Sequence, residues 1–466
     1  MPRFTNKMRH LPPVASLILL TLMLLPGCAR EQTPEPMRIV LTADIRGRLV
    51  PCGCFTGQLG GMTRLFTRLE QTKTLNELRV DAGDALQGVQ DFEIMEYERI
   101  LEAFGMMDFQ ALNIGAREAE LSAAALSRIQ SKAQAPLISA NLFSQESGQT
   151  ILPPYIKTKV GGKIVILTGI LHPDSIDPTQ LGEGLRLDPP ELALKALLPK
   201  LREQCDLLVL LAFANEDKLR QLAEQFYEPD FILGGDVSQP SGNTRQINQS
   251  HVFYVANESR TIGLIDFVAA YGKQRPSIRI NHARPVLLDE DILEAETILQ
   301  IAQAYREEIR VTPLAIDHPE SHPVAQVPGI RPLAHYVGTE SCTACHLAEH
   351  AIWKDTGHAH AWASLKYKKA DADPNCIACH SVGFGSESGY RREFEHEKLI
   401  NVGCESCHGP GSQHVEERTA GGTALQRFRP LAAGDCRTCH YGEFSRPFDW
   451  DTFWPRVAHG QQTTNK

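Results

Sequence analysis

The feature that most constrains this chain is a Cys-x-x-Cys-His motif that is repeated four times between residues 342 and 440. Two thiols three positions apart can each form a thioether with one vinyl group of a heme, and the imidazole that follows then reaches the iron. Thiol pairs that form two zinc sites or a set of disulfides would leave the histidine after every pair unexplained. The motifs therefore predict four covalently bound c-type hemes. The thioether cysteines would be Cys342, Cys345, Cys376, Cys379, Cys404, Cys407, Cys436 and Cys439, and the proximal iron ligands His346, His380, His408 and His440.

The second axial ligand of these irons cannot be methionine within this region, because all eight methionines lie at or before Met107. Histidine pairs and low reduction potentials are therefore expected. So little protein around four hemes must place them close together, which predicts an electron conduit. The other histidines beyond residue 332 are His335, His350, His358, His360, His396, His414 and His459.

The N-terminus has the pattern of an export signal. Basic residues precede an apolar run over residues 14–25, which is short for a membrane-spanning helix of roughly 20 residues. The run ends in Leu25-Pro26-Gly27-Cys28, which resembles a bacterial lipobox with Cys28 as the lipidated residue. Because Ala29 follows, we expect an outer-membrane lipoprotein that faces the periplasm or the cell surface. An ordinary cleaved signal peptide with an incidental cysteine is the alternative.

Length and charge set the domain organisation and exclude one class of partner. A chain of 466 residues exceeds what one core usually supports, and a net charge of −9 gives no reason to expect nucleic-acid binding. We expect a signal peptide and tether over residues 1–36, a globular domain over 37–288, a helix and Pro-rich linker over 289–332, and a heme domain over 333–466.

The segment before the linker alternates short apolar runs with helical patterns, which predicts an α/β or α+β domain. Buried strands are expected at residues 37–41, 78–81, 109–114, 164–170, 207–211 and 231–233, and helices at 90–104, 116–132 and 215–225.

The C-terminal motifs resemble those of the tetraheme cytochrome c-554 family. The resemblance covers about residues 333–445 and rests on Tyr336-Val337-Gly338-Thr339, residues 353–360, residues 380–384 and residues 403–414. It implies a mainly helical domain packed around heme, three bis-histidine hemes, one five-coordinate heme, and electron transfer from a redox partner such as hydroxylamine oxidoreductase.

Carried onto this chain, the resemblance makes His358 and His414 distal iron ligands. His459 is expected to be the third, because it lies beyond the last motif. The five-coordinate heme would be the one held by His380, where a small ligand could bind. His350 and His360 are expected to lie outside the coordination spheres.

The N-terminal domain resembles the metallophosphoesterase domain of the 5'-nucleotidase family, which implies a sandwich fold. Residues 42–47 stand where that family has an Asp-x-His loop, residues 81–84 where it has a bridging aspartate, and residues 113–118 where it has Gly-Asn-His-Glu. The family's second, nucleotide-gripping domain has no counterpart here.

Most of the family's metal ligands are replaced, so we expect no catalytic metal pair and no phosphoesterase activity. Asp44 and Asp84 remain, with Asp236 as a third carboxylate, whereas Arg46, Ala116 and Arg117 replace a histidine, an asparagine and the catalytic histidine. Residues 211–213 and 234–238 also lack the usual histidines. Guanidinium groups stay protonated and do not bind metal, so Arg46 and Arg117 are expected to pair with Asp44 and Asp84. Rearranged ligands would have to come from His172, His251 or His282.

Three cysteines remain. Cys205 precedes an apolar run and is expected to be a core residue. Cys52 and Cys54 follow the first aspartate loop. They could form a disulfide, a redox-active dithiol or a metal-ligand pair.

Three functions follow from these patterns. The first is a lipid-anchored electron carrier whose N-terminal domain docks a partner or binds a small anion. The second is a periplasmic metallohydrolase fused to a cytochrome. The third is a heme oxidoreductase that acts on a small nitrogen or sulfur compound at an open heme.

Overall fold

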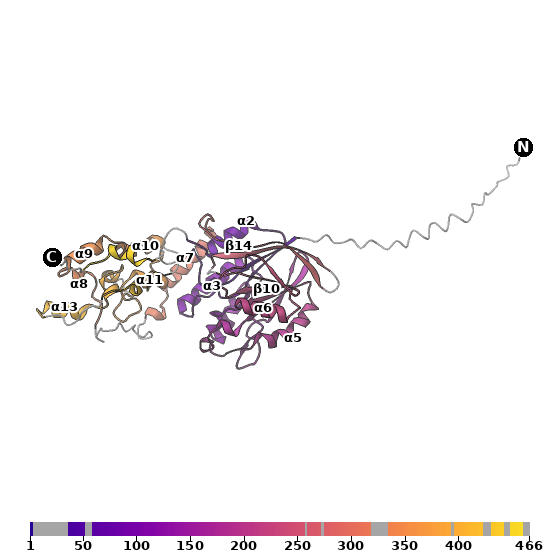
Figure 1. The fold of residues 1–466 in the computed structure, drawn as a ribbon, viewed down its shortest axis with the longest axis horizontal. Coiled ribbons are helices and arrows are strands. Elements are labelled where there is room, and N and C mark those ends of the chain that lie inside the picture. The colour runs from indigo at the N-terminus through magenta and orange to yellow at the C-terminus, as the bar shows by residue number, and fades with distance from the viewer. Residues whose placement is uncertain are drawn as a thin grey trace.

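The computed structural model describes residues 1–2, 36–51, 58–256, 259–271, 275–317, 334–392, 396–422, 430–441 and 448–459. They form a sheet-rich N-terminal lobe and a helical C-terminal lobe, with helix α7 (Glu296–Val311) where the two meet (Figure 1). Among these residues, no helix is both long enough and apolar enough to span a membrane.

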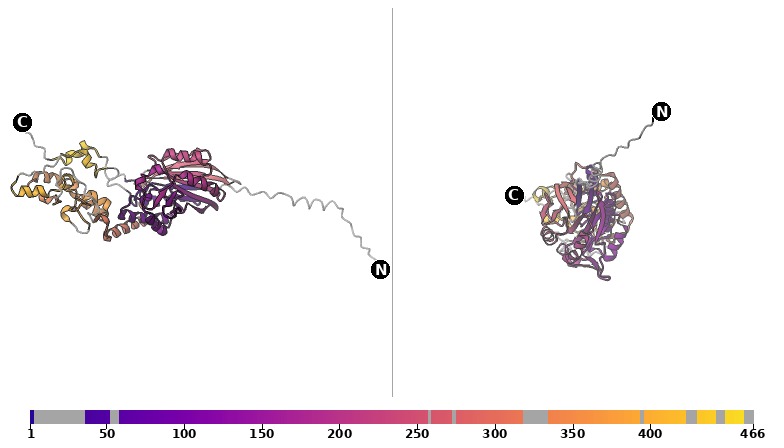
Figure 2. Two further views of the ribbon diagram at one scale, coloured as in Figure 1. Left: turned by 90° about the horizontal axis from the view of Figure 1, so that it is seen from below. Right: turned by 90° about the vertical axis from the view of Figure 1, so that its right-hand side faces the viewer.

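The N-terminal lobe is a sandwich of two six-stranded sheets (Figure 2). Both sheets mix parallel and antiparallel pairs, and a separate pair joins β5 (Leu142–Ser144) to β8 (Leu185–Leu187). The first sheet has the order β14 (Pro276–Leu287), β13 (Thr261–Tyr271), β1 (Pro36–Thr42), β2 (Glu77–Asp81), β3 (Ala111–Asn113), β4 (Leu137–Ile138). The second has the order β11 (Arg245–Ile247), β12 (Ser250–Tyr254), β10 (Phe231–Gly235), β9 (Leu207–Phe213), β7 (Lys163–Leu171), β6 (Tyr155–Val160).

Strand periodicity divides the apolar side chains between three clusters. In β1, Ile39 and Leu41 enter the core between the sheets, whereas Val40 faces the helices on the outer side. Helices α2 (Met62–Thr72), α3 (Asp91–Met106), α4 (Ala123–Lys132) and α7 cover the first sheet, and α5 (Pro190–Arg202) and α6 (Glu216–Gln225) cover the second. Alternate residues of a strand point to opposite faces, so strands buried on both faces read as continuous apolar runs.

The six predicted strands and the helices at 90–104 and 215–225 are confirmed, with ends shifted by a few residues. The single helix predicted over 116–132 is wrong. A 3-10 turn over Glu118–Glu120 comes first, and α4 begins only after Ser122, whose side chain accepts a hydrogen bond from the Ala125 amide at 3.2 Å. A serine N-cap starts a helix at its own position, which the hydrophobic pattern alone does not reveal.

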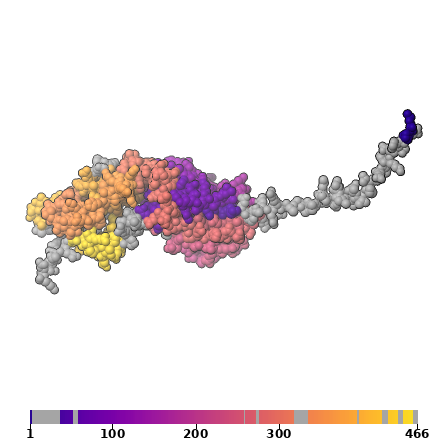
Figure 3. All heavy atoms as spheres, turned by 90° about the horizontal axis from the view of Figure 1, so that it is seen from above, coloured from indigo at the N-terminus to yellow at the C-terminus, as the bar shows by residue number. Residues whose placement is uncertain are grey.

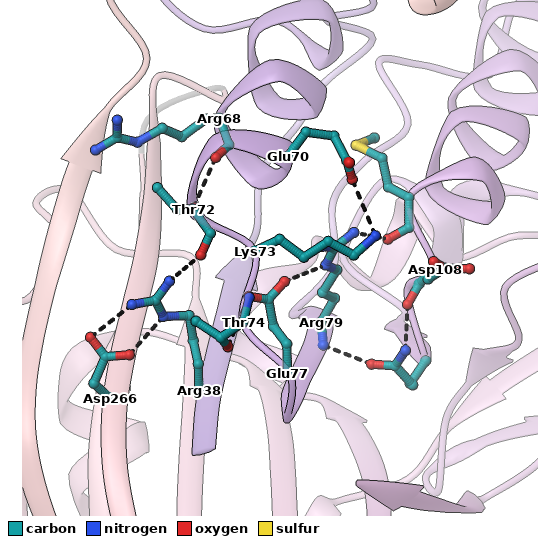
Figure 4. A network of polar contacts seen from close by, with 12 residues as sticks. Arg38, Arg68, Glu70, Thr72, Lys73, Thr74, Glu77, Arg79, Asp108 and Asp266 are labelled. Atoms are coloured by element: carbon teal, nitrogen blue, oxygen red, sulfur yellow. Dashed lines mark hydrogen bonds and ion pairs between the residues drawn. The ribbon is translucent and has the colours of Figure 1, made fainter. Parts of the chain in front are cut away.

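Charged residues tie the first sheet to its helices near the start of β1 (Figure 4). The Arg38 guanidinium donates to both carboxylate oxygens of Asp266 on β13, at 2.6 and 3.0 Å, and to the carbonyl oxygen of Thr72 at the end of α2. On β2, Arg79 pairs with Glu77 at 2.6 Å, and both side chains are buried. These contacts are charge-assisted. Those of Arg38 join β1 to β13 and to the end of α2, whereas the Arg79–Glu77 pair lies within β2.

The C-terminal lobe consists of short helices and loops with little apolar core. Its buried apolar cluster holds seven residues, among them Trp362, Ile377 and Tyr390. Such a small core among the described residues agrees with the prediction that covalently bound hemes complete the interior of this lobe. Its helices are α8 (Glu340–Thr343), α9 (Leu347–Lys354), α10 (Ala361–Lys368), α11 (Pro374–His380), α12 (Cys404–His408), α13 (Ser412–Thr419), α14 (Ala433–Cys436) and α15 (Trp450–Phe453).

The two lobes pack directly against each other (Figure 3). The buried side chain of Arg392 donates to both oxygens of Asp317, at 3.1 and 3.0 Å, and to the carbonyl oxygens of Ile309, Thr312 and Ala372. Arg310 on α7 forms a second forked pair with Asp371, at 3.0 and 3.3 Å. The Arg392 guanidinium thus joins the end of α7 to the loop that leads into the second heme motif.

Replacing Arg392 with Met should lower the free energy of unfolding by about 3–5 kcal/mol, because the Asp317 carboxylate would remain buried without its cation. Urea denaturation followed by circular dichroism measures this loss. Arg391→Met is the matched control, since the Arg391 guanidinium donates to the carbonyl oxygen of the exposed Glu387. The Asp317→Asn/Arg392→Met double variant should recover part of the loss. A double variant less stable than Arg392→Met would contradict this account.

Candidate functional site

Each heme motif lies on or beside a helix of one or two turns. The second and third motifs lie within α11 and α12, and the first and fourth begin in α8 and α14 and continue directly beyond them. Residues three and four apart share one face of a helical turn, so both thiols and the histidine of a motif face the same side.

Three of the four motif histidines are paired with a second histidine ring from a distant part of the chain. The ring centroids are 6.2 Å apart for His346 and His414, 5.9 Å for His440 and His358, and 5.8 Å for His408 and His459. Two imidazole nitrogens on opposite sides of one metal ion, each about 2 Å from it, place their ring centroids about 6 Å apart. The donor set and its spacing therefore fit bis-histidine iron in the first, fourth and third motifs.

His380 of the second motif differs from the other three. No second histidine ring pairs with it among the described residues, although His358 lies near enough to interact electrostatically. Its Nδ1–H donates to the Ala361 carbonyl oxygen at 2.7 Å. This hydrogen bond fixes the tautomer and leaves Nε2 as the nitrogen that can bind iron.

Burial favours the neutral form of the histidine rings, which is the form that binds iron. It lowers the pKa of four imidazoles below the usual value, so these rings are neutral near pH 7. Neutral imidazole is the form that binds a metal ion. The four rings are His358, His380, His408 and His440.

Contacts between cysteines of different motifs give their order in space. The Cys342 and Cys404 side chains lie close enough to shift each other's pKa, and Cys379 lies close enough to lower the pKa of Cys439. Cys407 lies in the electrostatic field of the two cysteines of the fourth motif. The motifs therefore follow one another in the order first, third, fourth, second. The second motif is at the end that faces the N-terminal lobe, where Gln87 donates to the Asn375 side chain at 3.2 Å.

A second polar cluster lies in the N-terminal lobe, where the loops after β1, β2 and β10 meet. Asp44, Arg46, Asp84 and Asp236 in these loops all have positive φ angles, from 48° to 70°. Residues other than glycine rarely adopt this conformation, and such strain concentrates at functional sites. The loops thus have the backbone form of a binding site.

Two arginines occupy the centre of this cluster. The Arg46 guanidinium contacts the Asp44 carboxylate and lies 3.6 Å from Asp84. Arg117 pairs with Asp84 at 3.2 Å through its side chain, and its backbone amide donates to the same carboxylate at 2.8 Å. Ala116, in the loop after β3, offers no donor atom in its side chain. The aspartates are therefore held by cations, as the sequence predicts.

Burial, together with the charge of Glu118, raises the pKa of Asp84 to about 7, although the Arg117 amide and guanidinium oppose the shift. Asp236 accepts a hydrogen bond from Ser175 at 2.6 Å and lies in the electrostatic field of Asp44, Arg46 and His172. Of the three histidines considered as substitute ligands, only His172 lies beside this cluster. His251 packs against the Phe231 ring and His282 lies on β14. Among the described residues, no group of three His, Cys, Asp or Glu side chains could hold a metal ion.

Comparison with known proteins assigns the C-terminal lobe. Residues 341–409 match the family described as "Cytochrome c554 and c-prime". The chain is 38% identical over 109 residues to cytochrome c-554 of Nitrosomonas europaea, which is 20% of this chain and 46% of that protein. The C-terminal lobe is homologous to cytochrome c-554. The homology implies that this cytochrome c-554-like lobe carries covalently bound c-type heme, and its repeated motifs make it a multiheme domain.

The N-terminal lobe is similar to 5'-nucleotidases. It is 22% identical over 295 residues to human 5'-nucleotidase, which is 56% of this chain and 51% of that protein. The solved 5'-nucleotidase precursor from Thermus thermophilus superposes with a TM-score of 0.50 at 19% identity, over 59% of each chain. These likenesses show a 5'-nucleotidase-like fold. The chain spans about half the length of the curated relatives it matches.

Some predicted residues are placed differently or lie outside the described part of the chain. Cys205 is only half-buried, packs against the cluster around α5 and α6, and donates to the Leu201 carbonyl oxygen at 3.3 Å. The His350 ring packs against Trp353, and the His350 backbone amide donates to the carbonyl oxygen of His346 at 2.9 Å. Cys28, Cys52 and Cys54 lie outside the described residues.

One buried carboxylate in the cytochrome c-554-like lobe escapes sequence reasoning. Glu405, inside the third motif, accepts hydrogen bonds from the amides of Val337, Gly338 and Gly411, at 2.7 to 3.1 Å. It therefore holds the segment before the first motif against the third. Its only signal in the sequence was a charged residue between two heme cysteines, which reads equally well as an exposed side chain.

Removing a distal histidine should open one iron. His414→Ala, His358→Ala and His459→Ala are each expected to convert one low-spin ferric heme to a high-spin form, because the second axial imidazole is lost. Electron paramagnetic resonance of the oxidised protein counts the high-spin hemes. His350→Ala is the matched control and should leave the count unchanged. A distal variant with an unaltered spectrum would show that its histidine is not a ligand.

Proposed function

We propose that this protein is an exported, lipid-anchored electron carrier with four covalently bound c-type hemes and no phosphoesterase activity. The observation that best supports the proposal is the pairing of three motif histidines with second histidine rings at the spacing of one metal ion. Bound heme supplies one-electron chemistry. The chain holds each heme through two cysteines, selects the neutral imidazole tautomer and excludes methionine from the axial positions.

The order of the motifs supports a directional role. Electrons would enter or leave at the first motif, at the far end of the C-terminal lobe, and at the second motif, beside the N-terminal lobe. Redox proteins are the expected donor and acceptor. A lipid on Cys28 would attach the chain to the outer membrane, facing the periplasm or the cell surface, and nothing in its charge favours nucleic acid.

The N-terminal lobe would serve docking or the binding of a small anion. Its carboxylates already have cationic partners in Arg46 and Arg117. A pair of metal ions would have to displace both guanidiniums from a buried site, which would leave those charges without their partners. The fold is therefore used without the metal chemistry of its relatives.

A second function is favoured by one observation. His380 has no paired histidine ring among the described residues, so the iron of the second motif could keep an open position. Heme with an open position can bind and convert a small molecule. The second candidate is therefore an oxidoreductase that acts on a small nitrogen or sulfur compound at this heme.

Heme content tests the carrier directly. The purified protein, matured with cytochrome c assembly machinery, should contain four hemes per chain by absorbance and intact mass, three of them low-spin. Cys376→Ala/Cys379→Ala should lose one heme, and the high-spin signal should disappear with it. Fewer than four hemes in the unaltered protein would contradict the proposed carrier, whereas four low-spin hemes would rule out the oxidoreductase and leave the carrier standing. Carbon monoxide binding to the reduced protein should occur only when the second motif is intact.

Metal content tests the N-terminal lobe. After incubation with manganese or zinc and gel filtration, we expect less than stoichiometric metal and no hydrolysis of nucleoside monophosphates. Arg46→His/Ala116→Asn/Arg117→His is a matched variant that restores the donor types at three positions, and it should retain more metal than the unaltered protein. Stoichiometric metal together with phosphatase turnover in the unaltered protein would establish the metallohydrolase instead.

A further inference from the structure

Two buried carboxyl groups face each other where the lobes meet. Glu96 lies on α3 in the N-terminal lobe and is 7% exposed. Asp373 precedes α11, the helix that carries the second heme motif, and is 8% exposed. A Cβ atom at Gly47 would meet both Glu96 Oε2 and Gln87, and Gln87 in turn donates to Asn375, whose amide donates to Asp373. The charge of Asp373 disfavours ionisation of Glu96. Buried carboxylates normally have a cation or several donors nearby, so this pairing calls for a physical explanation.

Glu96 has few groups that could stabilise its charge. Its Oε2 atom is buried and has no hydrogen-bond partner among the described residues. The nearby Tyr305 hydroxyl donates instead to the Phe92 carbonyl oxygen at 3.2 Å. A Cβ atom at Gly47 would lie only 2.7 Å from Glu96 Oε2. The Gly47 backbone therefore covers that side of the Glu96 carboxyl group, and no other side chain can reach Oε2 from there. The site favours a protonated carboxyl over a carboxylate.

Asp373 lies close to the heme attachment. Its Oδ1 atom accepts a hydrogen bond from the Asn375 amide at 3.0 Å, as an N-cap does. The Cys376 sulfur, one of the two predicted thioethers, lies within hydrogen-bonding reach of the same carboxylate. A change in charge at the heme is therefore felt at Asp373 across a short distance inside the protein, where screening by water is weak.

The charged groups around the pair do not fully balance it. Burial is the largest effect on both groups and raises the pKa of each carboxyl above its usual value. Arg306 opposes the shift at both sites, although it also donates to the Lys368 carbonyl oxygen at 3.1 Å. The other groups that act on the pair are Arg48 and Glu93 at Glu96, and Arg392, which also holds Asp317, at Asp373.

We propose that Glu96 and Asp373 together form a proton-binding site whose occupancy is linked to the oxidation state of the heme attached at Cys376 and Cys379. This inference rests on the proposed heme at the second motif. Reduction of a heme held there, by one electron from a protein donor, would remove one positive charge beside the pair. Glu96 and Asp373 would then take up one proton from solvent, and reoxidation would release it. Because the two carboxyls interact, the proton belongs to the pair rather than to either residue.

The consequence is a role for the N-terminal lobe that needs no metal. Glu96 comes from the 5'-nucleotidase-like fold and Asp373 from the cytochrome c-554-like fold, so neither lobe alone contains the site. The N-terminal lobe, which lacks the usual metal ligands, would then determine how the reduction potential of the heme at the second motif depends on pH.

The test is a redox titration of the full-length holoprotein, followed through the high-spin signal of the iron held by His380. The reduction potential is measured from about pH 5 to about pH 9. Over part of this range it should fall with rising pH, by a tenfold change in the reduction equilibrium per pH unit, which is about 59 mV for a one-electron couple. Glu96→Gln and Asp373→Asn should each reduce this slope by more than half near neutral pH, because a single carboxyl titrates lower. Asparagine keeps the N-cap, so Asp373→Asn should fold.

Glu102→Gln is the matched control, since Glu102 lies on the same helix with its side chain 40% exposed, and it should keep the full slope. A redox-difference infrared spectrum should also show a protonated carboxyl band that is lost in Glu96→Gln. A pH-independent potential in a protein with four hemes would overturn the proton link. A missing heme at the second motif would instead overturn the proposed function, and heme counting separates the two results.

Discussion

Three pairs of imidazole rings, each spaced as the two axial ligands of one metal ion would be, join distant segments of the C-terminal lobe. His414, His358 and His459 each lie in a different segment from the motif histidine they face. The apolar cluster of this lobe is small, so folding cannot rest on side-chain burial alone. Covalently bound heme would supply the missing apolar surface, and metal bonds to the paired rings would hold distant segments together. The short helices at the first, third and fourth motifs are positioned so that each motif histidine ring can face its partner ring.

The N-terminal lobe depends on the opposite situation, a large core that needs no cofactor. Its two sheets and three apolar clusters fix the loops after β1, β2 and β10. Because the core supports strained conformations at Asp44, Asp84 and Asp236, the loops keep their geometry while Arg46 and Arg117 occupy the centre. The 5'-nucleotidase-like fold thus holds two arginines at the centre of its loop cluster.

The contacts between the two lobes fix the position of the second heme motif. Arg392 and Arg310 fix the second heme motif against α7, and Gln87 reaches the same motif from the loop after β2. The second heme motif therefore lies beside polar and charged side chains that come from both lobes. The joining of the two folds therefore brings side chains of the N-terminal lobe to the helix of the second motif.

Residues close together in the chain were enough to determine the heme attachment, the strands of the sandwich and the loss of metal-binding residue types. The sequence also named His358, His414 and His459, but not which motif histidine each would face. That choice, the break before α4, the ion pairs of Arg46 and Arg117 and the meeting of Glu96 with Asp373 were decided by tertiary structure. They depend on contacts between residues far apart in the chain, whose distances and burial follow only from how the elements pack.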